Sequence, residues 1–203
     1  MKIVIVDYGM GNIRSIVGAI KHLGYNNVNV SDEEYELKNA NRLILPGVGN
    51  FSQAMKSIKL KRLDEMLSEI VMVDKKPILG ICLGMQLLSE SSTENGFNEG
   101  LGFVDGKVEK FTKKNIKVPH VGYNQINIEQ NSRLYHGINQ NPDYYFTHSY
   151  RLQSDSDIGQ SMCSYSEEFV ASFESGNISG TQFHPELSQN NGIKLLKNFV
   201  ENF

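Results

Sequence analysis

The fold of this chain is restricted most by its short apolar runs. They alternate with segments in which apolar residues recur at helical spacing. The runs lie at residues 2–7, 28–30, 43–45 and 77–81. Between the first two runs, apolar residues recur at helical spacing from Ile13 to Leu23, and Gly24 is a natural helix stop. A second helical region is expected over 55–71, broken near 59–61. Continuous apolar strands are typical of parallel sheets covered on both faces, so the pattern predicts an α/β fold with βαβ crossovers.

The later part of the sequence has a different character. Residues 101–183 contain shorter strand-like segments joined by polar turns, and 125–128 and 169–173 alternate in the manner of strands. Residues 192–203 have the apolar spacing of a closing helix. No repeat and no linker rich in Gly, Ser or Pro divides the sequence. We therefore expect residues 1–203 to form a single domain, with parallel strands first and an antiparallel extension later.

Composition argues against several classes of protein. A chain of 203 residues buries about 70% of its unfolded surface, so it needs neither disulfides nor a structural metal. The balance of 20 basic and 23 acidic residues argues against nucleic-acid binding. The apolar runs fall far short of the ~20 residues of a membrane span, and a strand directly after Met1-Lys2 predicts no signal peptide. Two cysteines make no disulfide framework, and we expect a cytoplasmic protein.

The sharpest local signal is the run from Gly80 to Gly84, which surrounds Cys82. It follows an apolar strand and opens a helix, as in the nucleophile elbow G-x-S-x-G with cysteine in place of serine. The glycines leave room for close backbone passage, and the helix dipole stabilises negative charge at the cysteine. A lone cysteine is more often buried and structural, but the strand–turn–helix context favours a nucleophile here.

Two further segments supply the parts that a thiol nucleophile needs. In an extended segment His184 and Glu186 point to the same side, and Pro185 favours that geometry. A Cys, a His and a carboxylate are a nucleophile, its general acid and base, and an orienting group. The glycine-flanked turn 46–49 follows the third strand, where backbone N–H groups can face an oxyanion together with the N–H of Leu83. No H-x-x-x-H or C-x-x-C pattern indicates a metal site.

Together, the motifs at 46–49, 80–86 and 182–186 resemble those of the class I glutamine amidotransferases. Residues 7–12, 119–124 and 145–150 resemble, more narrowly, the glutaminase subunits of imidazole glycerol phosphate synthases. The motifs occur in the family's order from the first strand to the last helix. The resemblance implies a flavodoxin-like amidotransferase domain with a central, mostly parallel sheet. It also implies a heterodimer in which a separate (β/α)8-barrel synthase uses the ammonia in histidine biosynthesis.

The resemblance assigns roles to individual residues. Cys82 would attack the side-chain amide of glutamine, His184 would be the acid and base, and Glu186 would orient His184. The residues expected to hold glutamine and its oxyanion are Gly47, Val48, Gly49, Leu83, Gln86, Ser149 and Tyr150. Water would release glutamate from the thioester. Because the thiolate supplies the nucleophilicity, no cofactor and no metal are expected.

Two motifs depart from the family's usual pattern. Leu187 stands where Lys or Arg is usual, at a position expected to face the synthase. Val121 and Tyr123 stand where Met and Trp are usual. These departures leave open a paralogous amidotransferase whose barrel partner aminates a sugar precursor for a surface glycan.

Two more distant alternatives are weaker. A catalytically silent regulatory subunit has no need of the intact set Cys82, His184 and Glu186. A cysteine peptidase has no need of Gln86 and the glycine turn, which suit a small amide. Among the other histidines, His120 and His148 are as readily explained by structural hydrogen bonds as by catalysis, and His22 and His136 are expected at the surface. Cys163 is expected to pack in the core.

Overall fold

The computed structural model describes residues 1–112, 116–129 and 131–203. The strands of its larger sheet are β1 (Ile3–Val6), β2 (Val28–Ser31), β3 (Arg42–Leu45), β4 (Ile78–Ile81), β8 (His120–Asn127), β9 (Asp143–His148), β11 (Gln160–Tyr165), β12 (Glu167–Ser175) and β13 (Ile178–Thr181). A smaller sheet contains β5 (Ser91–Ser92), β6 (Asn98–Glu99), β7 (Lys107–Lys110) and β10 (Tyr150–Gln153). The helices are α1 (Ile13–His22), α2 (Glu34–Lys38), α3 (Phe51–Leu60), α4 (Leu63–Leu67), α5 (Leu83–Leu87) and α6 (Gln189–Asn202), with a π-helical turn η1 (Ser68–Val73) and a 3-10 turn η2 (Pro185–Leu187).

The strand order of the larger sheet is β2-β1-β3-β4-β13-β12-β11-β8-β9. From β2 to β13 every neighbouring pair is parallel, and from β13 to β9 every pair is antiparallel. The expected order, parallel strands first and an antiparallel extension later, is thereby confirmed. The last parallel strand, β13, comes from near the end of the chain and lies beside β4.

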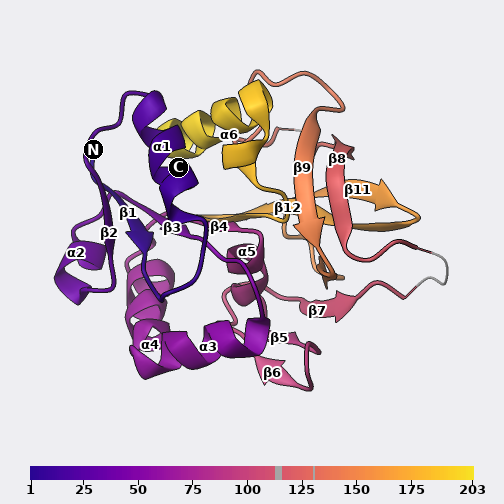
Figure 1. The fold of residues 1–203 in the computed structure, drawn as a ribbon. Helices are drawn as coiled ribbons and strands as arrows, with labels where there is room; N and C mark the ends of the chain where they lie inside the picture. Colours follow the sequence, from indigo (N-terminus) through magenta and orange to yellow (C-terminus); the bar gives the residue numbers. More distant parts are fainter. Residues whose placement is uncertain (113–115, 130) are drawn as a thin grey trace.

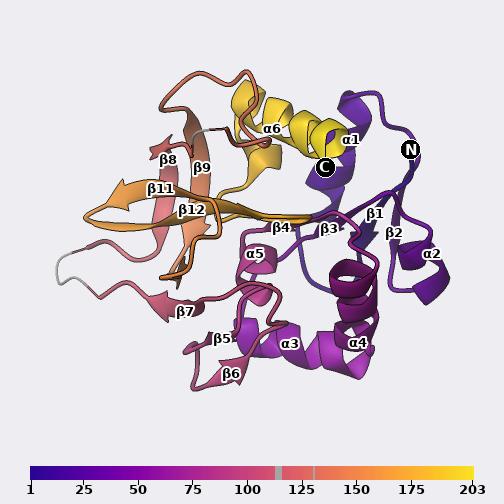
Figure 2. The same ribbon diagram turned by 180° about the vertical axis from the view of Figure 1, so that it is seen from behind.

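Helices cover both faces of the parallel part of the sheet. Helices α1 and α6 lie on one face, and α3, α4 and α5 lie on the other (Figure 1, Figure 2). Strand β1 shows why its sequence is apolar throughout: Ile3 and Ile5 pack in the cluster that includes α1 and α6, while Val4 and Val6 pack in the opposite cluster. None of the helices in the described ranges has the length and apolar character needed to cross a membrane.

The elements of the structure can be compared with the sequence-based expectations. Helix α2 was not expected, because its five residues are mostly charged. The expected break near 59–61 is confirmed, because α3 ends at Leu60 and α4 begins at Leu63, with a left-handed φ of 56° at Arg62. Residues 169–173 lie within the strand β12, as their alternating pattern predicts, but neither face of the strand is exposed there. All five residues are buried, because apolar side chains of both core clusters cover the two faces of β12.

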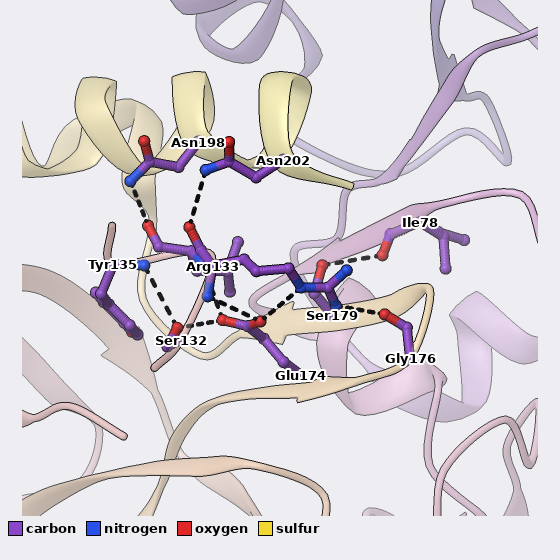
Figure 3. Close-up of polar contacts among 10 residues, drawn as sticks. Ile78, Ser132, Arg133, Tyr135, Glu174, Gly176, Ser179, Asn198 and Asn202 are labelled. Atoms are coloured by element: carbon purple, nitrogen blue, oxygen red, sulfur yellow. Dashed lines mark hydrogen bonds and ion pairs between the residues drawn. The ribbon is translucent and has the colours of Figure 1, made fainter. Parts of the chain in front are cut away.

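A polar cluster beneath α6 holds the segment 131–138 against β12 (Figure 3). The carboxylate of Glu174 accepts hydrogen bonds from the backbone N–H groups of Arg133 and Leu134, at 3.1 and 2.9 Å, and from the hydroxyl of Ser132. On the other side of the loop, the amide of Asn198 on α6 donates to the Leu134 carbonyl at 2.8 Å. The Glu174 carboxylate thus accepts hydrogen bonds from two consecutive backbone N–H groups of this segment.

Candidate active site

The residues that the sequence singled out come together at the carboxyl ends of three neighbouring parallel strands. Cys82 directly follows β4, the 46–49 turn follows β3, and His184 comes shortly after β13. Parallel strands end at the same edge of a sheet, and ligands bind at this edge in open α/β sheets. Cys82 and His184 therefore line one cavity, although they lie 102 positions apart in the sequence.

Cys82 occupies a backbone conformation that L-residues rarely adopt. Its φ of 54° and ψ of −109° make a sharp turn between β4 and α5. A Cβ atom at Gly84 would lie 1.9 Å from the Leu45 carbonyl oxygen, and one at Gly80 would lie 2.7 Å from the Gly84 carbonyl oxygen. The two glycines are therefore required by close packing of the turn. The strain at Cys82 is of the kind that tertiary structure holds in place at functional sites.

His184 and Glu186 form a buried pair. Nδ1 of His184 donates to Oε1 of Glu186 at 2.9 Å, and the side chains are 4% and 0% exposed. The expectation of an extended segment from His184 to Glu186 was wrong, because Pro185 opens the 3-10 turn η2 and Glu186 lies inside it. Proline is favoured at the first position of such a turn, whose curvature brings Glu186 back to the ring.

The electrostatics of His184 depend on its two neighbours. Burial disfavours the charged ring, but the side chains of Cys82 and Glu186 outweigh burial and raise the pKa of His184 to about 10. Its Nε2 atom is buried and makes no hydrogen bond. Nδ1 is engaged by the carboxylate, so Nε2 is the nitrogen left for chemistry at Cys82. This arrangement suits a thiol that gives its proton to histidine.

A cavity of about 270 Å³ opens beside the sulfur of Cys82. Its lining residues are Val48, Gly49, Cys82, Leu83, Gln86, Glu94, Pro119, Thr147, His148, Ser149, Tyr150 and His184. The volume lies just below the roughly 300–1,000 Å³ of sites for drug-sized ligands, which suits a molecule as small as an amino acid. Glu186 lies behind His184, outside this lining.

Gly47 is placed differently from the other expected glutamine-binding residues, because it does not line the cavity. It packs behind it: a Cβ atom at Gly47 would lie 2.5 Å from the backbone nitrogen of Gly84 and 2.8 Å from the hydroxyl of Tyr8. That buried hydroxyl donates to the Pro46 carbonyl at 2.7 Å. Tyr8 therefore anchors the turn that presents Val48 and Gly49 to the cavity.

Gln86 belongs to a hydrogen-bonded wall of the cavity. Its Nε2 atom donates to the Tyr150 carbonyl and to Oε1 of Gln182, each at 2.9 Å. Gln182 in turn donates from Nε2 to the sulfur of Cys82 at 3.8 Å. Because both protons of the Gln86 amide are used within the protein, the atom that it offers to a ligand is its acceptor, Oε1.

Sequence reasoning missed three residues at the site: Tyr8, Gln182 and Glu94. Glu94 lines the cavity, and its Oε2 accepts from the backbone N–H of Phe51 at 2.7 Å, at the start of α3. No local pattern around residue 94 indicates this role. A carboxylate in the wall provides a partner for a ligand's ammonium group.

Size alone does not identify the site. A larger cavity of about 660 Å³ lies between the two sheets, with Glu90, Asp105, Glu109, Asp155 and Glu168 among its acidic lining residues. No member of the cysteine–histidine–glutamate set reaches it. Within the described ranges, no group of three or more His, Cys, Asp or Glu side chains is arranged to hold a metal ion.

Comparisons with known proteins agree on the fold and on the family. The family model for glutamine amidotransferase class-I matches residues 4–203. Among solved structures, a putative GMP synthase protein of Thermoplasma acidophilum superposes with a TM-score of 0.74, at 20% identity over 98% of this chain and 92% of that one. A second, titled a glutamine amidotransferase, superposes with a TM-score of 0.75, at 17% identity over 98% and 97% of the two chains. The expected flavodoxin-like fold is confirmed.

Curated relatives are more similar in sequence and match over nearly their whole length. "Imidazole glycerol phosphate synthase subunit HisH 1" of Campylobacter jejuni is 46% identical over 199 residues, which cover 98% of both chains. "Imidazole glycerol phosphate synthase subunit HisH 2" of Vibrio vulnificus is 45% identical, covering 99% of this chain and 94% of its own. "Imidazole glycerol phosphate synthase subunit HisH" of Methanosarcina acetivorans is 44% identical, covering 98% of both.

Proposed function

The chain belongs to the class I glutamine amidotransferase family, and on that premise we propose that it is the glutaminase subunit of an imidazole glycerol phosphate synthase. It hydrolyses glutamine to glutamate and ammonia. One observation carries the activity: a strained Cys82 shares a small cavity with His184, whose other ring nitrogen is bound by the buried Glu186. The names of the relatives favour this function over the sugar-aminating alternative.

The chemistry is acyl transfer through a thioester. His184 takes the proton of the Cys82 thiol, and the thiolate attacks the side-chain amide carbon of glutamine. His184 then returns the proton to the leaving nitrogen, which departs as ammonia while the C–N bond breaks. Water enters, gives one proton to His184 and attacks the thioester, so that glutamate leaves and the thiol is restored. Glu186 holds the ring and stabilises its positive charge at each transfer.

The polar walls of the cavity match the polar ends of glutamine. We assign the α-ammonium group of glutamine to Glu94 and to Oε1 of Gln86, two acceptors in the lining of the cavity. The backbone at Ser149 and Tyr150 holds the remainder of the amino acid. The oxyanion is stabilised by the N–H of Leu83 and by the turn at 47–49, which Tyr8 anchors.

The protein works with a synthase that consumes the ammonia. Ammonia becomes protonated in bulk water and loses its nucleophilic lone pair, so a sheltered path to a (β/α)8-barrel partner is required. We place that partner at the face that carries Val121, Tyr123 and Leu187, which are 54%, 47% and 40% exposed. The two departures from the family pattern meet here, because the Tyr123 hydroxyl donates to the Leu187 carbonyl at 2.8 Å. The partner therefore meets an apolar side chain at position 187.

We also propose that the enzyme acts in the cytoplasm. Both Cys82 and Cys163 are free thiols. A reducing compartment keeps a catalytic thiol in that state.

The direct test combines an assay with a genetic experiment. The chain is co-purified with the synthase subunit of its own host, and glutamate release from glutamine is measured with and without the imidazole-pathway acceptor. We expect glutamate release with the acceptor, and growth of a histidine auxotroph that lacks its own glutaminase subunit when this chain and its partner are supplied together. Glutaminase activity without complementation would favour the sugar-aminating enzyme, and no glutaminase activity would contradict the proposal.

A further inference from the structure

Two buried histidines next to the cavity, His120 and His148, take no part in the chemistry described above. They are 2% and 6% exposed and face each other across the β8–β9 pair, where they are register partners. His120 stacks on Tyr165 at 3.9 Å and on Phe146 at 4.8 Å between ring centroids. Nδ1 of His120 and Nε2 of His148 lie 2.9 Å apart, so the two rings share one hydrogen bond.

The partners of these rings fix the position of every proton. The Tyr150 carbonyl only accepts, so Nδ1 of His148, 2.8 Å away, must donate to it. Nε2 of a neutral His148 is then an acceptor, and Nδ1 of His120 donates to it. Nε2 of His120 accepts in turn from the side-chain amide of Asn124, at 3.2 Å. Burial lowers the pKa of His120 to about 4 and that of His148 to about 3, so both rings are neutral at physiological pH.

The chain of donors ends at the point where the backbone changes sheets. Strand β9 ends at His148 in the larger sheet, and β10 begins at Tyr150 in the smaller one, which leaves Ser149 alone at the corner. The Tyr150 carbonyl accepts from the His148 ring and from the Gln86 amide, at 2.8 and 2.9 Å. The Tyr150 carbonyl thus links two parts of the cavity lining. One is the corner at Ser149, and the other is the hydrogen-bonded wall that runs from Gln86 through Gln182 to the sulfur of Cys82.

We propose that His148, held in a single tautomer by His120, is a positioning residue for glutamine binding. Its Nδ1–H fixes the Tyr150 carbonyl, and with it the backbone at Ser149 and the amide of Gln86. The inference rests on the proposed glutaminase function, because glutamine is the ligand that this wall is assigned to hold. His148 moves no proton in the reaction.

Asparagine and leucine at position 148 separate positioning from packing. The two side chains have nearly the same shape, but only asparagine carries an N–H near the place of Nδ1. In the complex with the synthase subunit, we expect the KM for glutamine of His148→Leu to exceed that of His148→Asn by about 3- to 10-fold, the value of one hydrogen bond. We expect kcat to differ less than KM between the two variants.

We expect the thermal stability of the two variants to follow the reverse order of their affinity for glutamine. Leucine suits the surrounding cluster of aromatic rings better than asparagine does, so His148→Leu should unfold at a higher temperature than His148→Asn. If His148 were only a packing residue, the KM values would follow stability and His148→Asn would bind glutamine more weakly. That order, or equal KM values for the two variants, would overturn the proposal.

Alkylation of Cys82 checks that the nucleophile itself is intact. Iodoacetamide is small and makes no use of the glutamine-binding wall, whereas a diazo-ketone analogue of glutamine requires it. We expect the analogue to label His148→Leu more slowly than His148→Asn while iodoacetamide labels both alike. Parallel losses with both reagents would overturn the proposal, because they would mean that the elbow has moved.

A second pair of variants keeps the test valid if substitutions at 148 prevent folding. His120→Asn retains a donor towards His148, and His120→Leu does not. We expect the same order of KM values with a smaller ratio, and equal values would count against the role of His120. If the unsubstituted complex releases no glutamate, the proposed function itself fails. If it does, and only the order of the variants is wrong, the failure belongs to this inference alone.

Discussion

The two cysteines show how position in the fold sets the chemistry of a side chain. Cys163 lies in the interior of β11 at 1% exposure, and burial raises the pKa of its thiol to about 12. Cys82 is also mostly covered, but it lies at a strained turn, borders a cavity and has His184 as a neighbour. Only Cys82 therefore combines access with a base, and a structural role is enough to explain Cys163.

The roles of His184 and Glu186 predict an unequal and non-additive loss of activity. His184→Ala removes proton transfer and should lower kcat by about 100- to 10,000-fold, whereas Glu186→Gln removes only orientation and charge stabilisation and should cost less. The double variant should be little slower than His184→Ala, as measured by glutamate release. If the fold-reduction in kcat of the double variant equals the product of the reductions in the two single variants, the two residues act independently.

The pH profile tests the same pair by another route. Because the pKa of His184 is raised to about 10, the protonated ring is present below that pH and is lost as the pH rises through it. Glu186 contributes to this rise, so Glu186→Gln should move the alkaline limb of kcat/KM to lower pH. If the alkaline limb of Glu186→Gln lies at the same pH as that of the unsubstituted enzyme, the limb does not arise from the titration of His184.

At the scale of elements, the parts that could be predicted from the sequence are those fixed by local pattern. The run of apolar residues up to Ile81 and the flanking glycines of Cys82 predict β4, the turn and α5, because strand, elbow and helix are all encoded within a dozen residues. Glu94 and Tyr8 could not be predicted to reach the site, since their places depend on how the short β5–β6 hairpin and the turn after β1 pack against other elements. Similarly, the curvature of η2 overrode the extended geometry expected for Glu186.

The cluster around Glu174 gives a prediction for the stability of an element remote from the site. Glu174→Gln replaces one of two acceptor oxygens by a donor that faces backbone N–H groups of Arg133 and Leu134. We expect a loss of about 1–3 kcal/mol in the free energy of unfolding, measured in urea, with no change in the KM for glutamine. Glu168→Gln, at an exposed position of the same strand, is the control and should stay within about 0.5 kcal/mol of the unsubstituted chain. Equal stability of the two variants would show that the cluster does not hold the loop.

At the scale of the whole molecule, the site lies at one edge of the sheet, where a second subunit can both receive ammonia and influence the glycine turn. That residues 1–203 form one domain, and that the partner is a barrel, stay predictions.

The glycine turn at 47–49 is a suitable point of control. Tyr8 and the close packing at Gly47 hold its first part, while Gly49 has a φ of 100° and Val48 is 42% exposed.

Partner control predicts that the isolated chain is a poor glutaminase. Uncoupled hydrolysis wastes glutamine, and loss of one oxyanion donor costs about 100- to 1,000-fold in rate, so reorientation of the turn is enough to gate activity. Glutamate release should rise on adding the synthase, and again on adding its acceptor. Gly49→Pro should suppress the stimulated rate, because proline lacks the N–H and cannot adopt a positive φ. Equal rates in all three conditions would contradict this form of control.

Every step of the proposed chemistry depends on Cys82 as the nucleophile that attacks glutamine. The most direct measurement is mass-spectrometric mapping of the adduct formed with a diazo-ketone analogue of glutamine, in the complex with the synthase subunit. We expect one modified residue, Cys82, protection by excess glutamine, and no adduct in Cys82→Ser although that variant remains folded. An adduct on Cys163, or labelling that glutamine does not slow, would contradict it.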